Sequence, residues 1–331
     1  MELQNNFIFN TPIILASINR PDYLDRILSY YQKHNYDQFL IIADGSEQKW
    51  SGATSFKGKY LHLPRLSFRE RLIEGLDKSQ SDLAILCADD DFLVPAGLEK
   101  CTEFLRKNID YSCVHGQYGR FVINEDKINY TQKYAGLKSI TDNNPLLRIK
   151  KVFIPKYIPH VYAVHRRKSL ERVLQFKEMN EFEYLFNFEM LLTFSSLIDG
   201  KAKRINHIYN FREMENSKTG IRNNELDVKK IESAIRSCKV HLRLLVEDII
   251  NKDDFSDTID NAIEYLLKYH LFHYDKYIGK KLNIKTSSNN IMLYLAKLKQ
   301  PLALMKMSFS LFLLNNSKDA FPLYNEDAKK E

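Results

Sequence analysis

Three consecutive carboxylates, Asp89, Asp90 and Asp91, come after Ala88 at the end of the apolar run of residues 83–87. Like charges repel and ionised groups resist burial, so such a cluster beside a buried strand needs a compensating charge. Mg²⁺ or Mn²⁺ would supply it, because these hard cations take carboxylate oxygens and keep open positions for water and phosphates. An acidic turn that starts the next helix is the alternative interpretation.

The surrounding sequence predicts the elements that position this cluster. Continuous apolar runs are typical of strands buried on both faces, and they occur at residues 12–18, 39–43 and 83–87. Apolar residues at helical spacing predict helices over residues 23–31, 68–78 and 95–106. This alternation indicates an α/β fold with a mostly parallel, doubly wound sheet. The cluster then lies at the carboxyl edge of the sheet, where such folds bind ligands.

The middle of the chain continues the α/β pattern, and its end is helical. We expect strands over 111–134, 157–164 and 202–211, and helices over 168–176 and 181–198. From about residue 224 apolar residues recur at spacings of three and four, so we predict a catalytic domain over 1–222 and a helical region over 223–331. That region packs on the catalytic domain or in a homo-oligomer. Alternatively, its basic amphipathic end contacts a membrane surface.

Composition excludes several classes of protein. The net charge of +7 is modest and dispersed, which suits an anionic substrate or an acidic membrane surface and argues against nucleic-acid binding. The chain has neither GxGxxG nor a P-loop motif, which argues against an NAD enzyme or an ATPase. The four cysteines have no metal-site spacing, and no signal peptide or apolar stretch of about 18 residues is visible. We therefore expect a cytoplasmic protein, either free or peripheral at the inner face of the membrane.

The motifs, in their order, resemble a glycosyltransferase of GT-A fold, of the inverting family 2 type found in bacterial capsule and lipopolysaccharide biosynthesis. The resemblance covers roughly residues 11–217. It is carried by Asn19-Arg20-Pro21, by Asp44-Gly45-Ser46, by the acidic cluster with residues 92–98, by an acidic helix before Gly200, and by residues 209–213.

The resemblance implies an activity and leaves two alternatives open. It implies metal-dependent transfer of a sugar, with inversion, from a nucleotide-diphosphate donor to a hydroxyl of a surface glycan or lipid-linked glycan. The resemblance favours UDP as the nucleotide. One alternative is transfer of a phosphorylated alcohol or nucleotidyl unit on the same fold. The other is a non-catalytic assembly partner, because Ala88 and Met190 stand where the family carries acids.

The resemblance also assigns the donor-binding residues. It implies that Ser17, Asn19, Arg20 and Asp44 line the nucleotide pocket, although Asp44 with Gly45 is equally typical of an Asx turn. Arg71 is placed near the diphosphate, with Arg65 or Arg69 as substitutes.

Within the acidic cluster, Asp91 is the implied metal ligand, and Asp89 or Asp90 contacts ribose or a metal-bound water. Asp89 and His207 are further candidate metal ligands. Strand alternation predicts that Asp89 and Asp91 point one way and Asp90 the other.

The reaction itself needs a carboxylate that takes the proton of the attacking hydroxyl while the metal stabilises the leaving diphosphate. The resemblance places this base at Glu189, with Glu183 or Glu181 as alternatives. His165 and Arg166 are the candidates for contact with an anionic acceptor. Arg212 would clamp a phosphate.

Overall fold

The computed structural model describes residues 11–124, 127–133, 138–152, 159–175, 185–213, 240–242 and 244–245. Its strands are β1 (Ile13–Ser17), β2 (Leu40–Asp44), β3 (Lys59–His62), β4 (Leu83–Ala88), β5 (Asp91–Leu93), β6 (Tyr111–Asn124), β7 (Lys127–Lys133), β8 (Val164–Arg166) and β9 (Lys201–Glu213). Its helices are α1 (Pro21–Lys33), α2 (Phe68–Asp77), α3 (Pro95–Lys107), α4 (Pro145–Val152), α5 (Arg167–Leu174) and α6 (Leu185–Asp199), with short 3₁₀ turns at Asp37–Phe39 and Ser51–Thr54.

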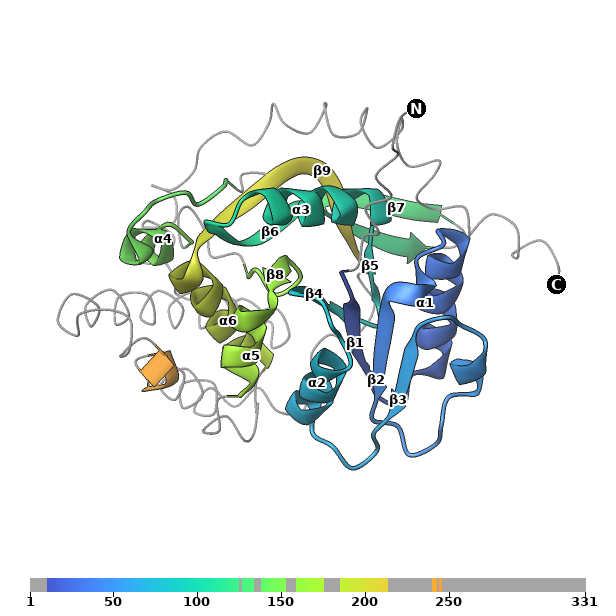
Figure 1. Cartoon of the computed structure of the whole chain (residues 1–331). Helices are drawn as coiled ribbons and strands as arrows, with labels where there is room; N and C mark the ends of the chain where they lie inside the picture. Colours follow the sequence, from blue (N-terminus) through green and yellow to red (C-terminus); the bar gives the residue numbers. More distant parts are fainter. Residues whose placement is uncertain are drawn as a thin grey trace, which may run out of the picture.

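The strands of the described residues form one nine-stranded sheet in the order β3-β2-β1-β4-β8-β6-β9-β5, with β7 paired to β6. The first half, from β3 to β4, is parallel throughout. The second half is mixed, because β8 runs antiparallel to β4 and β6, while β9 is parallel to β6 and antiparallel to β5. Figure 1 shows β1, β2 and β3 on one side of the molecule and β6, β7 and β9 on the other. The predicted α/β class is confirmed, and the parallel arrangement holds for the first half.

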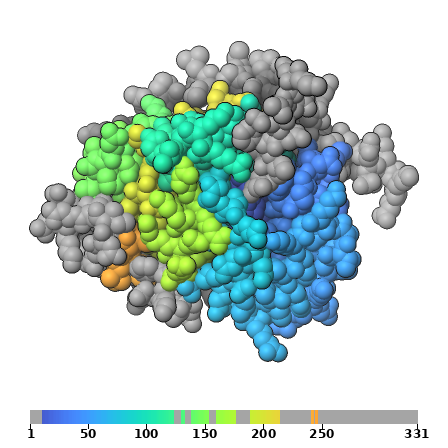
Figure 2. Space-filling model, in the orientation of Figure 1, coloured from blue at the N-terminus to red at the C-terminus, as the bar shows by residue number. Residues whose placement is uncertain are grey.

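The continuous apolar strands bury both faces of the sheet. Ile13 and Leu15 pack with α1, whereas Ile14 between them packs with α2 on the opposite face. This alternation follows from the two-residue repeat of side chains along a strand, and it explains why the interiors of these strands are apolar on both faces. The surface keeps the same division, with blue N-terminal residues gathered on one side and green residues on the other (Figure 2).

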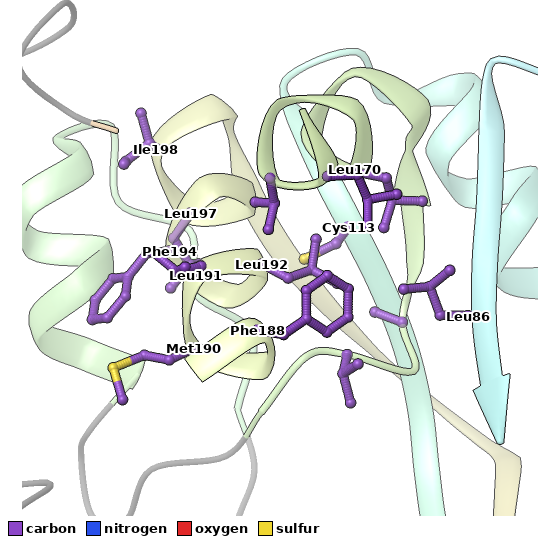
Figure 3. Close-up of a cluster of buried hydrophobic side chains, with 14 of the residues drawn as sticks. Leu86, Cys113, Leu170, Phe188, Met190, Leu191, Leu192, Phe194, Leu197 and Ile198 are labelled. Carbon is purple, nitrogen blue, oxygen red and sulfur yellow. The ribbon is translucent and has the colours of Figure 1, made fainter. Parts of the chain in front are cut away.

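Helix α6 is apolar on most sides because it is covered from several directions. Its core residues contact α4, α5 and the sheet within one hydrophobic cluster. Figure 3 shows Phe188 and Leu192 directed toward the side of Leu86, and Met190 and Phe194 directed away from it. Met190 is fully buried. The position where the family carries an acid is therefore a core position in this chain.

One expectation about an element needs correction, one helix was not expected, and one expected region falls outside the description. Of the strand expected over 157–164, residues 157–158 lie outside the described residues, and residues 159–163 form no strand because they contain a turn in which the Ala163 N–H donates to the His160 carbonyl (2.8 Å). Strand β8 begins at Val164. Helix α4 was not predicted. The helical region 223–331 lies outside the described residues, except for residues 240–242 and 244–245, which are helical. In the part of the chain that the structure describes, no helix is long and apolar enough to cross a bilayer.

Candidate functional site

A cavity of about 480 Å³ lies at the carboxyl ends of β1 and β2. Asn19 and Pro21 at the start of α1 form one wall, and the loop after β2 forms the other. Asp44 at the end of β2 also lines the cavity, and the loop contributes Ser46, Glu47, Gln48, Lys49, Trp50 and Ser51. The cavity therefore occupies the edge of a parallel sheet where ligands of α/β proteins bind.

Asp44 is the polar centre of this cavity wall and is fully buried. Its Oδ1 accepts hydrogen bonds from the Ser46 N–H (2.9 Å) and hydroxyl (2.5 Å), which is an Asx turn. Its Oδ2 accepts a hydrogen bond from the Tyr60 hydroxyl (2.6 Å), and that hydroxyl in turn accepts from the Trp50 N–H (2.9 Å). Asp44 thus forms the Asx turn and also lines the cavity, and its contact with a nucleotide stays a prediction.

Asn19 and Arg71 fix the end of β1 beside this turn. Asn19 has a left-handed backbone (φ 54°), a conformation that Asn tolerates better than most residues, and its N–H donates to Ser46 Oγ (2.7 Å). Of the three candidate arginines, Arg71 is the one whose guanidinium donates to the Ser17 carbonyl, from a buried position on α2. A side chain at Gly45 would lie 2.7 Å from Arg71 Nη1, so glycine is what allows this approach.

Arg20 neutralises two of the three adjacent acids. Its Nη1 lies 2.6 Å from Asp89 Oδ1, and its Nη2 lies 3.3 Å from Asp90 Oδ2. The guanidinium also stacks 3.7 Å above the Tyr23 ring. Asp89 further accepts from the Ser17 hydroxyl (2.6 Å). Burial raises the pKa of Asp89, although Ser17 and Arg20 both act to lower it.

The three acids are not on one continuous strand. Strand β4 ends at Ala88, residues 89 and 90 form a turn, and β5 begins at Asp91. Asp89 and Asp91 are buried, whereas the side chain of Asp90 is 34% exposed. Asp90 therefore differs from Asp89 and Asp91 in its burial. The turn at residues 89 and 90 causes this difference, and not the alternation along a strand that the sequence predicted.

Asp91 belongs to a second group of side chains, on the later part of the sheet. It is fully buried and pairs in register with Arg212 of β9, whose Nε lies 3.8 Å from Asp91 Oδ2. The Tyr162 ring lies 5.9 Å from the Arg212 guanidinium. Burial raises the pKa of Tyr162 and the charges of Asp91 and Glu189 raise it further, whereas Arg212 lowers it.

Glu189 reaches this second group from the first turns of α6. It lines a small cavity of about 20 Å³ together with Tyr118, Tyr162, Asn210 and Arg212. The structure thus brings the predicted base and Arg212 to one cavity, and Arg212 is itself paired with Asp91. Glu181 and Glu183, the alternative bases, lie outside the described residues.

The residues present fit a divalent cation held largely by its substrate. Among the described residues no three His, Cys, Asp or Glu side chains gather as a metal site. Mg²⁺ characteristically takes one or two protein carboxylates and fills its remaining positions with phosphates and water. Asp91 and the partly exposed Asp90, which precedes it in the sequence, would supply one or two such carboxylates, which Arg212 and Arg20 hold in ion pairs in this structure. His207 is a correction: it lies five residues before Arg212 on an extended strand, beside Lys100 of α3, and is not part of this group.

His165 and Arg166 are also not at the site. His165 is fully buried, with one ring nitrogen 2.9 Å from Ser196 Oγ and the other 2.8 Å from the His160 carbonyl. Arg166 donates to the backbone carbonyls of Tyr111, Leu105 and Asn108. Both residues hold elements together, and neither is placed to contact an acceptor.

Sequence reasoning missed Trp50, Tyr162 and Asn210, which line the two cavities. It also missed Tyr60, whose hydroxyl donates to Asp44 behind the wall of the larger cavity. One signal was available. Trp50 is the only tryptophan of the chain and stands in a polar stretch, and a large aromatic residue there indicates a buried contact. Trp50 is indeed 4% exposed.

Comparison with known proteins shows the fold. No protein-family model matches the chain, and no curated protein matches it significantly. Among solved structures, S. aureus TarS 1-349 in complex with UDP-GlcNAc matches with a TM-score of 0.54 at 12% identity, over 84% of this chain and 77% of that one. The same TarS piece in complex with UDP matches with a TM-score of 0.54 at 10% identity. The fold is GT-A-like. A longer TarS structure matches with a TM-score of 0.53 at 11% identity, and the match spans 46% of its length.

Proposed function

We propose that this chain transfers a sugar from a UDP-sugar donor to a hydroxyl group. The observation that carries the proposal is the cavity of about 480 Å³ at the carboxyl ends of β1 and β2, next to the acidic cluster. It has the size of a small-molecule site, and its mainly polar lining includes three apolar residues, Pro21, Leu24 and Trp50. The likeness in fold to TarS, which was solved with UDP and with UDP-GlcNAc, supports a uridine diphosphate donor.

The reaction assigns a role to each group of residues. The acceptor oxygen attacks the anomeric carbon of the donor and forms the new C–O bond, while its proton passes to the Glu189 carboxylate. The bond from the anomeric carbon to the phosphate oxygen breaks, and UDP leaves with the electron pair. Attack from the side opposite the leaving group inverts the anomeric centre. Arg212 lines the same small cavity as Glu189, and its guanidinium is suited to bind anionic oxygens of a substrate.

A divalent cation, Mn²⁺ or Mg²⁺, is part of the proposal. When bound at Asp90 and Asp91 it would neutralise charge on the leaving diphosphate. The surface-glycan or lipid-linked acceptor, the capsule or lipopolysaccharide pathway, the cytoplasmic location, a homo-oligomer and a membrane contact stay predictions from the sequence.

Calorimetric titration of UDP, CDP and GDP, each with and without Mn²⁺, tests the donor assignment. We expect UDP to bind most tightly and Mn²⁺ to strengthen its binding. Asp90→Asn and Asp91→Asn should remove the metal effect, and Asp77→Asn is the matched control because its side chain is 62% exposed and lies on α2 away from the cavity.

The alternative activities give different results. A folded wild-type chain that binds none of the three nucleotides contradicts the transferase and favours the assembly partner. Tighter binding of CDP than of UDP directs attention to nucleotidyl or phosphorylated-alcohol donors, and product analysis then decides whether a glycosidic or a phosphodiester bond is formed.

A further inference from the structure

Asn210 is a fully buried amide on β9. Among the described residues neither its Oδ1 nor its Nδ2 has a hydrogen-bond partner. A buried amide without partners is costly, so a protein that retains one usually supplies a water or a ligand to it.

The direction of Asn210 follows from the strand. Its neighbours Tyr209 and Phe211 pack in a hydrophobic cluster, so the amide projects from the other face of β9, on the same side as Arg212. There it lines the small cavity that Glu189, Tyr118 and Tyr162 also line. The unsatisfied amide is therefore aimed at the proposed base.

The size of this cavity limits its occupant. About 20 Å³ of space holds one water-sized oxygen, since a single water needs roughly 10–15 Å³. A hydroxyl oxygen of that size can accept a hydrogen bond from the Asn210 amide N–H and donate its own proton to the Glu189 carboxylate. A hydroxyl therefore uses both partners, whereas an apolar group would leave the amide unsatisfied.

We propose that Asn210 and Glu189 form the binding site of the attacking hydroxyl, which we call the seat. This inference rests on the proposed function and extends it by naming the residue that orients the nucleophile. Asn210 holds the oxygen by its amide N–H while Glu189 takes the proton, and the freed oxygen lone pair attacks the donor. In the absence of an acceptor, a water occupies the seat and hydrolyses the donor slowly by the same route.

The test uses the full chain and water as the nucleophile. UDP binding is measured by calorimetry, UDP release is measured from UDP-GlcNAc, UDP-glucose and UDP-galactose with Mn²⁺ present, and stability is measured by urea denaturation. The variants are Asn210→Leu, which fills the same volume without the amide, and Asn210→Ala, which folds if leucine does not fit. Asn206→Leu is the matched control, since Asn206 is an exposed asparagine on the same strand and bonds to Gln117.

We expect both Asn210 variants to bind UDP within about twofold of wild type and to release it about 100-fold more slowly, because misplaced nucleophiles lose rates of that order. Asn210→Leu should unfold at the same or a higher urea concentration than wild type, since an unsatisfied amide has been removed. Asn206→Leu should release UDP at the wild-type rate.

Several results would overturn the seat. They are wild-type rates of release in the Asn210 variants, loss of UDP binding in these variants while folded, or a wild type that binds UDP but releases none from any donor. Lower stability with unchanged release identifies Asn210 as a purely structural amide. A wild type that does not bind UDP at all contradicts the proposed function itself, and is thus distinguished from failure of the seat.

Discussion

Asp91 and Arg212 are cross-strand neighbours in β5 and β9, with 3.8 Å between Arg212 Nε and Asp91 Oδ2. Asp91 is fully buried, whereas the Arg212 side chain is 42% exposed. Residues far apart in the sequence thus join the acidic cluster to the strand that carries Asn210. Because Asp91 has no exposed surface, its charge depends on neighbouring groups rather than on water.

Removal of Arg212 should therefore destabilise the fold. We expect Arg212→Gln to lower the free energy of unfolding by about 2 kcal/mol, below the 3–5 kcal/mol typical of fully buried pairs, because Arg212 is partly exposed. The double variant Asp91→Asn/Arg212→Gln should lose less than the sum of the two single variants. Urea denaturation of the four proteins, without nucleotide or metal, measures this coupling. Strict additivity would show that the pair contributes nothing.

Tyr60→Phe should weaken both the fold and donor binding. The substitution removes the hydroxyl that donates to Asp44 and accepts from the Trp50 N–H, so it leaves one buried carboxylate oxygen and one backbone N–H without this partner. A loss of about 2 kcal/mol in unfolding free energy is expected. UDP affinity should fall about tenfold, the equivalent of roughly 1.4 kcal/mol, because the loop that lines the cavity is released.

Tyr111→Phe is the control for this effect. Tyr111 packs edge-on against Phe104, outside both cavities. It should change neither the denaturation midpoint nor the calorimetric affinity appreciably. A Tyr60→Phe variant that unfolds like the control would contradict the role assigned to the hydroxyl.

Gly97→Ala should destabilise the protein, although alanine ordinarily stabilises a helix by about 1 kcal/mol relative to glycine. Gly97 lies on α3 where the helix crosses β9, and an added Cβ would overlap the carbonyl oxygen of Ile208. Backbone cannot move aside like a flexible side chain, so we expect a loss of about 3 kcal/mol. The exposed neighbour gives the comparison: Ala96→Gly should cost no more than about 1 kcal/mol. A thermal-denaturation midpoint for Gly97→Ala at or above that of wild type would refute the close approach.

Acidification should destabilise the fold through three buried histidines. Burial lowers the pKa of His115 and His165 from 6.5 to about 4, and that of His160 well below 6.5; the nearby Arg204 lowers the value for His115 further. Below pH 6.5 these histidines therefore bind protons in the unfolded chain but stay neutral in the native state. As the pH falls from 6.5 toward 4, each histidine should remove up to about 1.4 kcal/mol of stability per pH unit.

Urea denaturation at several pH values measures this slope. His115→Gln should flatten it, whereas His207→Gln should change it little, since His207 is exposed. A stability that does not change over this pH range would contradict the burial of neutral imidazoles.

The parallel half of the sheet was predictable because its signals are local. Each continuous apolar run corresponds to a strand, and the cluster of three acids lies where β4 ends. Glu189 was placed by resemblance, and the structure brings it beside Arg212. The pairing of β5 with β9 was not predictable. The sequence pattern of each segment does not show which distant strand it pairs with, or in which register.

The basic segment of residues 165–167, which spans the end of β8 and the start of α5, shows why charge alone misleads. It suggested a surface for an anionic acceptor, yet Arg166 satisfies carbonyls at the end of α3, and Arg167 donates to the carbonyls of Leu76 and Ser79 at the end of α2. Helix ends leave carbonyls that need donors, and a long cationic side chain from another element can meet that need. Such partners are fixed by tertiary structure, which the local sequence does not encode.

The division of the sheet has a consequence for how the chain acquires its activity. The wall of the larger cavity comes from the ends of β1 and β2 and from the loop after β2, which are close together in sequence. Its contacts therefore close only short loops of chain, which costs little entropy. Glu189 and Arg212 reach the second cavity only after β9 has inserted between β6 and β5, a pairing of high sequence separation that forms slowly. A nascent chain would thus form the larger cavity before the cavity that Glu189 lines. Under the proposed function, it would be unable to hydrolyse a donor until β9 is in place.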